Sequence, residues 1–188
     1  MIDRLCDQAG GKDIAVVGLY CDFLSQQEQS TTNMLGAILK QLSRREDIPK
    51  DIREAFRKAK EEFGGRGLQR SDQVEIMKKV TASLSRVFIC IDALDESTPQ
   101  HRQELLQSLQ ELARGSRNTR IFLTGRPHIK DEIMRSFSKV VKIHLSPTEG
   151  DIENYLEMRL RRDTDSYAMD DELRADIMRV IPEKTSKM

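Results

Sequence analysis

The sequence lacks the features that mark membrane-spanning, secreted or strongly charged proteins. None of its apolar runs approaches the roughly 20 residues that a helix needs to cross a bilayer. Its first residues, MIDRLCDQAGG, contain no apolar stretch like that of a signal peptide. Thirty-one Lys and Arg residues balance 31 Asp and Glu residues, so no net charge attracts nucleic acid or an anionic membrane. We therefore expect an intracellular, cytoplasmic protein with no nucleic-acid or membrane partner.

Cysteine and histidine are few and scattered. The three cysteines, Cys6, Cys21 and Cys90, are odd in number and far apart, which predicts reduced thiols in or near the core. The three histidines share no ligand spacing with one another or with the cysteines, so we expect no zinc site.

Short apolar runs alternate with amphipathic segments along the 188 residues, 38% of which are hydrophobic. The apolar runs predict strands at 14–21, 87–91, 119–125 and 139–145. The amphipathic segments predict helices at 31–45, 49–63, 72–84, 100–115, 129–137, 151–163 and 170–181, after the tail of a helix at 1–8. Thr98 and Pro99 are expected to cap and begin the helix at 100–115, and Pro182 to end the last one.

Strands separated by helices indicate an α/β fold with a parallel sheet and helices on both faces. The last two helices follow the last predicted strand without another strand between them. We therefore expect one α/β domain over residues 1–146 and the start of a helical domain over residues 147–188.

Three acids follow the most apolar run of the chain, VFICIDALDE at residues 87–96. In a parallel sheet, ligands bind beyond the carboxyl ends of the strands, where Asp92 would lie. A carboxylate there can hold Mg²⁺ through water while the metal bridges phosphate oxygens. Asp95 or Glu96 could polarise an attacking water as a general base. Alternatively, the three acids only stabilise the N-terminus of the next helix.

A second motif, FLTGRP at residues 122–127, supports the metal–phosphate interpretation. Thr124 would end the adjacent strand and Arg126 would project from the turn beyond it. A guanidinium in that position can sense a γ-phosphate and offset charge that develops in phosphoryl transfer. Gly-Arg-Pro alone is typical of a simple turn. One helix and one strand separate it from Asp92, however, which is the spacing of neighbouring strands that converge on one site.

The motifs resemble a known family. VFICIDALDE resembles the Walker B motif of the NACHT class of STAND P-loop NTPases, and TRIFLTGRP resembles the sensor 1 strand of that class. VVGLYCDF followed by EQSTTNMLGAILKQL is similar to the strand and helix after the first βα unit, and LSPTEGDIENYLEMRL to the passage into the helical domain. The resemblance covers residues 2–181 and is greatest to fungal NACHT proteins whose nucleotide domain is described as nephrocystin-3-like.

This resemblance implies a role for each candidate site residue. Asp92 would coordinate the metal, Asp95 and Glu96 would be paired acids near the attacking water, and Thr124 and Arg126 would face the nucleotide. The family implies Mg²⁺ and ATP or GTP as cofactors. It also implies a switch in which nucleotide rearranges the NTPase and helical domains to control oligomerisation and signalling. Such proteins often carry an effector domain and ankyrin or WD repeats.

The phosphate loop of the family has no counterpart in the sequence. A Walker A motif requires Gly-x-x-x-x-Gly-Lys-Ser/Thr between a strand and a helix. The only Gly-Lys pair, in QAGGKD at residues 8–13, lacks the earlier glycine, has Asp13 in place of the hydroxyl and precedes a strand. We interpret it as a turn and expect that the chain begins too late to include the loop and the first, central strand.

Two expectations follow from the missing loop. The runs at 119–125 and 139–145 would have to pair directly or leave open strand edges. Without the backbone cradle and lysine that bind phosphates, the chain alone should bind nucleotide weakly and show little or no ATPase activity.

Two other functions remain open. The chain could be a nucleotide-free interaction module that binds protein partners through Ile152, Tyr155 and Leu156, although such a stripe is more typical of a helix packed in a core. It could also be a metal-dependent hydrolase or nuclease that uses the three acids. The sequence offers no further acid or histidine cluster to complete a two-metal site.

Overall fold

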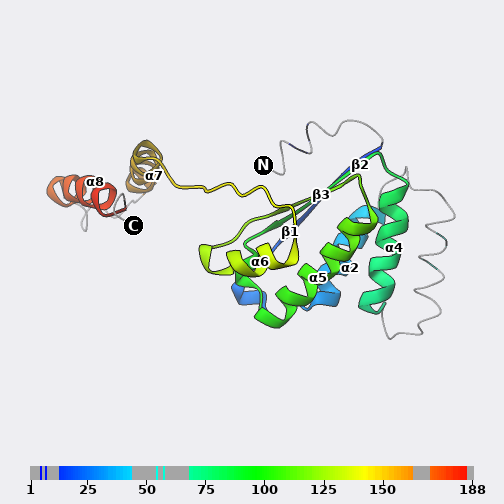
Figure 1. Ribbon diagram of the computed structural model, residues 1–188. Coiled ribbons are helices and arrows are strands. Elements are labelled where there is room, and N and C mark those ends of the chain that lie inside the picture. The colour runs from blue at the N-terminus through cyan, green and yellow to red at the C-terminus, as the bar shows by residue number, and fades with distance from the viewer. Residues whose placement is uncertain are drawn as a thin grey trace. The chain divides into compact units, whose positions relative to one another are not determined.

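A computed structural model of the protein describes Leu5, Asp7, Glu54, Arg57 and residues 13–43, 68–162 and 170–185 (Figure 1). Two compact units are present, Met1–Val140 and Val141–Met188. The predicted helix at 49–63, the helix tail at 1–8 and the Gly-Lys turn lie largely or wholly outside the described residues. No helix in the described ranges combines the length and apolar character needed to span a bilayer.

The first unit is built on a three-stranded parallel sheet in the order β1-β2-β3. The strands are β1 (Ile14–Tyr20), β2 (Arg86–Asp92) and β3 (Thr119–Leu123). Val16 pairs with Phe88, which in turn pairs with Arg120. The α/β class, the parallel sheet and three of the predicted strands are confirmed.

The helices of this unit form one layer. They are α2 (Thr31–Ser43), α4 (Arg70–Ala82), α5 (Pro99–Gly115) and α6 (Lys130–Ser136), with short 3-10 turns η1 (Phe23–Ser25), η2 (Leu94–Glu96) and η3 (Pro127–Ile129). Figure 1 shows α2, α4, α5 and α6 on one side of the sheet. Right-handed crossovers between strands laid down in sequential order put every connection on the same face. Helices were expected on both faces, and those that the structure describes cover one.

The core lies between this helical layer and the sheet. β1 and β2 turn alternate side chains toward the helices, and these are almost fully buried: Ala15, Val17, Val87, Ile89 and Ile91. α2 and α5 meet them with stripes of leucine, isoleucine and methionine at helical spacing. Each such side chain contributes about 1.5–3 kcal/mol when fully buried.

The first turn of α5 follows the predicted capping pattern. The Thr98 side chain accepts a hydrogen bond from the backbone N–H of His101, and Pro99 occupies the first turn, where its missing N–H costs nothing. The cap fixes where the chain leaves the acidic turn η2 and enters α5.

A side chain of α2 satisfies the outer edge of β1 at Gly18. The Gln41 amide accepts a hydrogen bond from the Gly18 backbone N–H at 3.0 Å and donates one to the Gly18 carbonyl at 2.8 Å. A side-chain amide carries one donor and one acceptor, as a backbone unit does, so Gln41 occupies the place of a neighbouring strand.

The predicted strand at 139–145 is wrong. The structure assigns no strand to this segment, and Val141, Ile143 and Leu145 are 90%, 75% and 83% exposed. Alternating apolar residues favour a strand only where a neighbour can satisfy the backbone. β3 pairs with β2 alone among the described strands. The sheet described by the structure does not include a direct pairing of the two runs.

The second unit consists of α7 (Glu149–Arg162) and α8 (Asp171–Thr185), which contact each other. On α7, Leu156 is buried, Ile152 is half-buried and Tyr155 is 55% exposed. The predicted apolar stripe of α7 is thus divided between packing and solvent.

The prediction that Pro182 ends the last helix is also wrong, because α8 continues to Thr185. Proline removes one backbone donor and crowds the preceding turn, which is costly in a helix interior. Pro182 lies in the last turn, where few hydrogen bonds follow, so the helix tolerates it.

The core and the segment at 139–145 should respond differently to the same truncation. Leu105 is fully buried, so Leu105→Ala should lower the free energy of unfolding by about 2–5 kcal/mol. Leu145→Ala removes the same atoms from an exposed position and should change it by less than about 0.5 kcal/mol. Urea unfolding of both variants measures this. A large loss for Leu145→Ala would show that this segment packs after all.

Candidate functional site

The five predicted site residues come together at the carboxyl ends of β2 and β3. Asp92 ends β2, and Thr124 directly follows β3. The Thr124 N–H donates to the Ile91 carbonyl, and the Leu94 N–H donates to the Thr124 carbonyl, both at 2.9 Å. These bonds continue the parallel pairing past the end of the strands, so the acidic turn and the Gly-Arg-Pro turn lie side by side.

Thr124 fixes the carboxylate of Asp92. Its hydroxyl donates to Asp92 Oδ1 and accepts a hydrogen bond from the Ala93 N–H at 2.9 Å. Ala93 has φ 52°, the left-handed conformation that non-glycine residues rarely adopt. The hydroxyl therefore holds a strained turn and one oxygen of Asp92 together. The other oxygen, Oδ2, receives no hydrogen bond from a described residue.

Asp95 is buried against the neighbouring turn. Its side chain is 5% exposed, its Oδ1 accepts from the Arg126 backbone N–H at 3.1 Å, and its Oδ2 lies 3.4 Å from Arg126 Nε. Gly125 permits this approach, because a Cβ there would lie 2.6 Å from Ile129 Cδ1 and 3.3 Å from Asp95 Oδ1. A larger residue at position 125 would require the Ile129 and Asp95 side chains to shift.

Glu96 is more accessible than Asp95. Its side chain is 25% exposed, and its Oε1 lies 3.1 Å from Arg126 Nη2. The guanidinium of Arg126, with 72% of the side chain exposed, thus bridges both acids. The cluster of Asp92, Asp95, Glu96 and Arg126 carries three carboxylates and one guanidinium, so its formal charge is negative when all the acids are ionised.

The loop after β1 also belongs to the site, and the sequence analysis missed it. The Cys21 N–H donates to the Asp92 carbonyl at 3.0 Å, and Gln26 Nε2 donates to the Glu96 carbonyl at 2.6 Å. Gln29 closes the loop through two hydrogen bonds to the backbone of Asp22, at 3.1 and 3.2 Å. The only signal was the glutamine-rich string SQQEQS, which has no periodicity and fits any polar loop.

A buried arginine on α5 supports the acidic turn from behind. Arg102 is 7% exposed, donates through Nη1 to the Ser97 carbonyl at 2.9 Å and through Nε to Glu132 Oε2 at 2.8 Å. A buried charge is tolerated when it is paired and hydrogen-bonded in this way. Sequence periodicity could not reveal it, because an arginine in an amphipathic helix is usually solvated.

The acids do not converge on a common point. No group of three or more His, Cys, Asp and Glu side chains is arranged to hold a metal ion in the parts of the chain that the structure describes. Asp95 and Glu96 direct oxygens at Arg126 instead. The arrangement gives no support to a two-metal hydrolase or nuclease.

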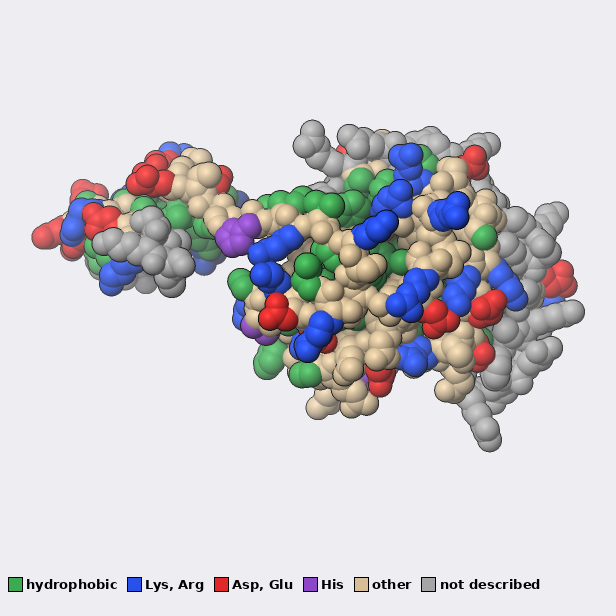
Figure 2. Space-filling view, in the orientation of Figure 1, with side chains coloured by type: hydrophobic (Ala, Val, Ile, Leu, Met, Phe, Trp, Pro, Cys, Tyr) green, Lys and Arg blue, Asp and Glu red, His purple; other side chains and the backbone are tan. Residues whose placement is uncertain are grey.

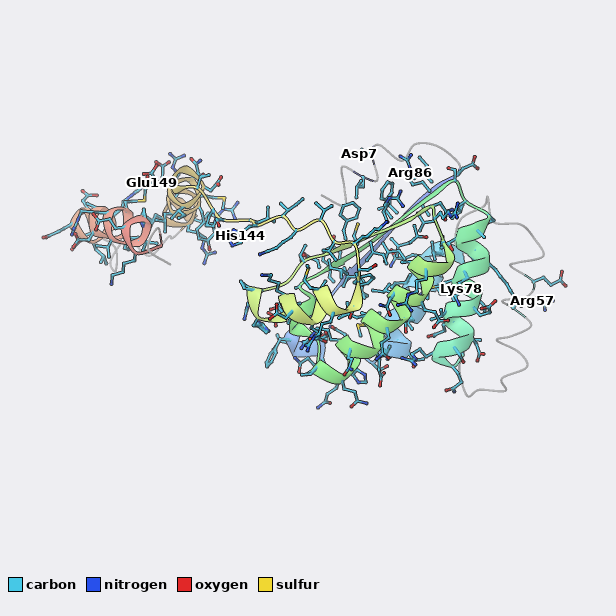
Figure 3. All side chains as sticks on the ribbon, in the orientation of Figure 1. Asp7, Arg57, Lys78, Arg86, His144 and Glu149 are labelled. Carbon is cyan, nitrogen blue, oxygen red and sulfur yellow. The ribbon has the colours of Figure 1, made fainter. Side chains whose placement is uncertain are left out.

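Charge is distributed differently away from the site. Figure 3 shows Arg86 at the opposite end of β2 from the acidic turn, and Lys78 on α4. Lys78 Nζ lies 2.7 Å from Glu111 Oε1 on α5, beside an open cavity of about 380 Å³ that Arg70, Glu75 and Ser108 help to line. Figure 2 shows basic and acidic side chains interspersed over this part of the surface. The acidic cluster at the strand ends is therefore a local feature.

Cys21 reports on this environment. The thiol is buried, and burial together with the carboxylates of Asp92, Asp95 and Glu96 raises its pKa to about 11. The thiolate is the reactive form, so folding should make this cysteine less reactive.

Iodoacetamide at pH 8 should alkylate Cys21 about a hundredfold more slowly in the folded than in the urea-unfolded protein, because its pKa is about two units higher in the folded protein. Peptide mass spectrometry, with Cys21→Ala to assign the site, measures the rate, and equal rates would contradict this environment.

The role of Thr124 can be tested with two substitutions. Thr124→Val keeps the shape but leaves the Ala93 N–H without a partner, so it should lower the free energy of unfolding by about 1–3 kcal/mol. Thr124→Ser keeps the hydroxyl and should cost less than half as much. Urea unfolding distinguishes the two. If Thr124→Val is as stable as the unmodified protein, the hydroxyl does not hold the two strand ends together.

Comparison with known proteins identifies a family for this fold and site. A sequence model of the family described as Nephrocystin 3, N-terminal, matches residues 1–126, which include all three strands and the five site residues. No curated protein and no protein of solved structure gives a significant match. Because the matched region covers more than half of the 188 residues, this chain belongs to the nephrocystin 3 N-terminal family.

Proposed function

We propose that the chain is part of a nucleotide-dependent signalling switch of the NACHT type, a STAND-class P-loop NTPase. In this proposal, Asp92, Glu96 and Arg126 serve the phosphates of Mg²⁺-bound ATP or GTP. One observation carries it: two adjacent parallel strands lead into a carboxylate, one oxygen of which receives no hydrogen bond from a described residue, and into an arginine, and Thr124 joins the two strand ends. Ligands of parallel sheets bind at this end.

The residues fit part of such a ligand. Oδ2 of Asp92 is a hard oxygen donor that suits Mg²⁺, directly or through water, and the guanidinium of Arg126 suits a phosphate oxygen. Bound Mg²⁺ would supply charge neutralisation on the phosphate oxygens. The acids outnumber the arginine, however, so a triphosphate without the metal would be repelled. We therefore propose that this chain by itself binds nucleotide weakly and hydrolyses it slowly, if at all.

The switch would couple the two parts of the chain. The α/β domain at 1–146 would carry the nucleotide, and the helical domain that starts at residue 147 would respond to it. Protein partners, including further copies of the chain on activation, would bind one of the resulting domain arrangements. The support is indirect: the family match covers the α/β part, and α7 and α8 form a separate helical unit.

Thermal unfolding with millimolar Mg·ATP or Mg·GTP tests the proposal. A ligand that binds only the folded state raises the unfolding midpoint by mass action. At a ligand concentration equal to Kd, it adds about 0.4 kcal/mol to the free energy of unfolding. We expect a small rise that requires Mg²⁺, disappears in Asp92→Asn and Arg126→Gln, and persists in Arg161→Gln. Arg161 is a suitable control because its side chain is 73% exposed and ion-paired, like that of Arg126.

A second function, a nucleotide-free interaction module, has one observation in its favour. Tyr20, Phe23 and Leu24, at the end of β1 beside the site, are 63%, 64% and 91% exposed. Clustered exposed apolar residues are typical of protein-binding surfaces. A cooperative unfolding transition that neither nucleotide shifts would reject the switch for this chain and favour the interaction module.

A further inference from the structure

We infer that Asp95 is a positioning residue that orients Arg126, and that Glu96 alone of the two adjacent acids is placed to act on a water molecule. The part that concerns water and phosphate rests on the proposed function. The part that concerns Asp95 and Arg126 rests on the geometry of the two turns.

Burial separates the two acids. The side chain of Asp95 is 5% exposed and that of Glu96 is 25% exposed. A general base must reach a water molecule within hydrogen-bond distance. Both oxygens of Asp95 are engaged by position 126, whereas Oε2 of Glu96 receives no hydrogen bond from a described residue.

Asp95 holds Arg126 at two points. One oxygen accepts a hydrogen bond from the backbone N–H of Arg126, and the other lies 3.4 Å from its Nε. A single carboxylate therefore contacts both the backbone and the guanidinium group of Arg126. The backbone hydrogen bond fixes where the side chain begins, and the ion pair favours rotamers that bring Nε to Asp95. The turn is tightly packed on its other side, because a Cβ on Gly125 would lie 2.6 Å from Ile129 Cδ1.

The guanidinium of Arg126 has donors that remain available to a ligand. Nε and Nη2 face the acids, and Nη1 makes no hydrogen bond to a described residue, although 72% of the side chain is exposed. One nitrogen of the exposed guanidinium is therefore left to donate to a phosphate oxygen. Fixing the donor before the ligand arrives lowers the entropic cost of binding.

The test observes Arg126 directly and needs no nucleotide. The ¹⁵N–¹H signal of its Nε–H group can be assigned as the arginine signal that is absent from Arg126→Lys. Arg161, equally exposed and paired with Glu157 along one helix, provides the matched reference. We expect the Nε–H of Arg126 to exchange with solvent about tenfold more slowly than that of Arg161. Asp95→Asn should remove this difference, and Glu96→Gln should leave most of it.

Two results would overturn the assignment of Asp95. One is exchange at Arg126 that is as fast as at Arg161 in the unmodified protein, a comparison that stands even if Asp95→Asn does not fold. The other is a folded Asp95→Asn variant, verified by its circular dichroism and thermal transition, whose Arg126 signal is unchanged.

A nucleotide measurement separates this inference from the proposed function. If Mg·ATP raises the unfolding midpoint, Asp95→Asn should lose the rise to the same extent as Arg126→Gln, and the control Arg161→Gln should retain it. Loss in Arg126→Gln with full retention in Asp95→Asn would refute positioning while the nucleotide site stood. If no nucleotide binds at all, the proposed function fails, and the exchange rates still decide the role of Asp95.

Discussion

The hydrogen bonds between Thr124 and the end of β2 are the constraint on which the site depends. Backbone bonds from Thr124 to Ile91 and Leu94 extend the pairing of two strands into the turns that follow them. The hydroxyl then adds bonds to Ala93 and Asp92. Without this junction, the acidic turn and the arginine turn would be separate loops. With it, the rigidity of the buried sheet is transmitted to polar side chains at the surface.

The layers behind the junction maintain it. Arg102 and Glu132 hold the end of the acidic turn from the helical side, and Gln26 holds it from the loop after β1. These polar contacts are partly shielded from water, which strengthens them but makes each unpaired group costly. The site is therefore organised as a set of turns, each fixed by a neighbour from another part of the chain.

Much of this arrangement could be predicted from the sequence, because the decisive patterns are local. The apolar run before Asp92 and the run before Thr124 each indicate a buried strand, and parallel strands bring their carboxyl ends to one edge. Thr98 and Pro99 specify a helix start by their own chemistry. Asp92, Glu96 and Arg126 could thus be placed in one region from their spacing alone.

The errors and omissions concern features that depend on distant partners. The run at 139–145 has the alternation of a strand, yet no described strand pairs with it, and alternation carries no information about a neighbour. Gln26 and Arg102 act through contacts with residues far away or in another element, and nothing in their local sequence distinguishes them from solvated side chains. The difference between Asp95 and Glu96 is likewise one of burial, which adjacent letters in a sequence cannot express.

The two edges of the sheet differ in how their backbone groups are satisfied. At β1, Gln41 already occupies the place of a neighbouring strand. At β3, the backbone N–H and C=O of Thr124 point toward β2. Because these groups point to opposite sides in successive residues of a strand, those of Leu123 and Ile121 point away from β2. A strand that joined this sheet beside β3 would therefore have one of its ends next to Arg126. Ile121, Leu123 and Arg126 belong to one short stretch of chain, so any group that paired with this edge of β3 would also border the site.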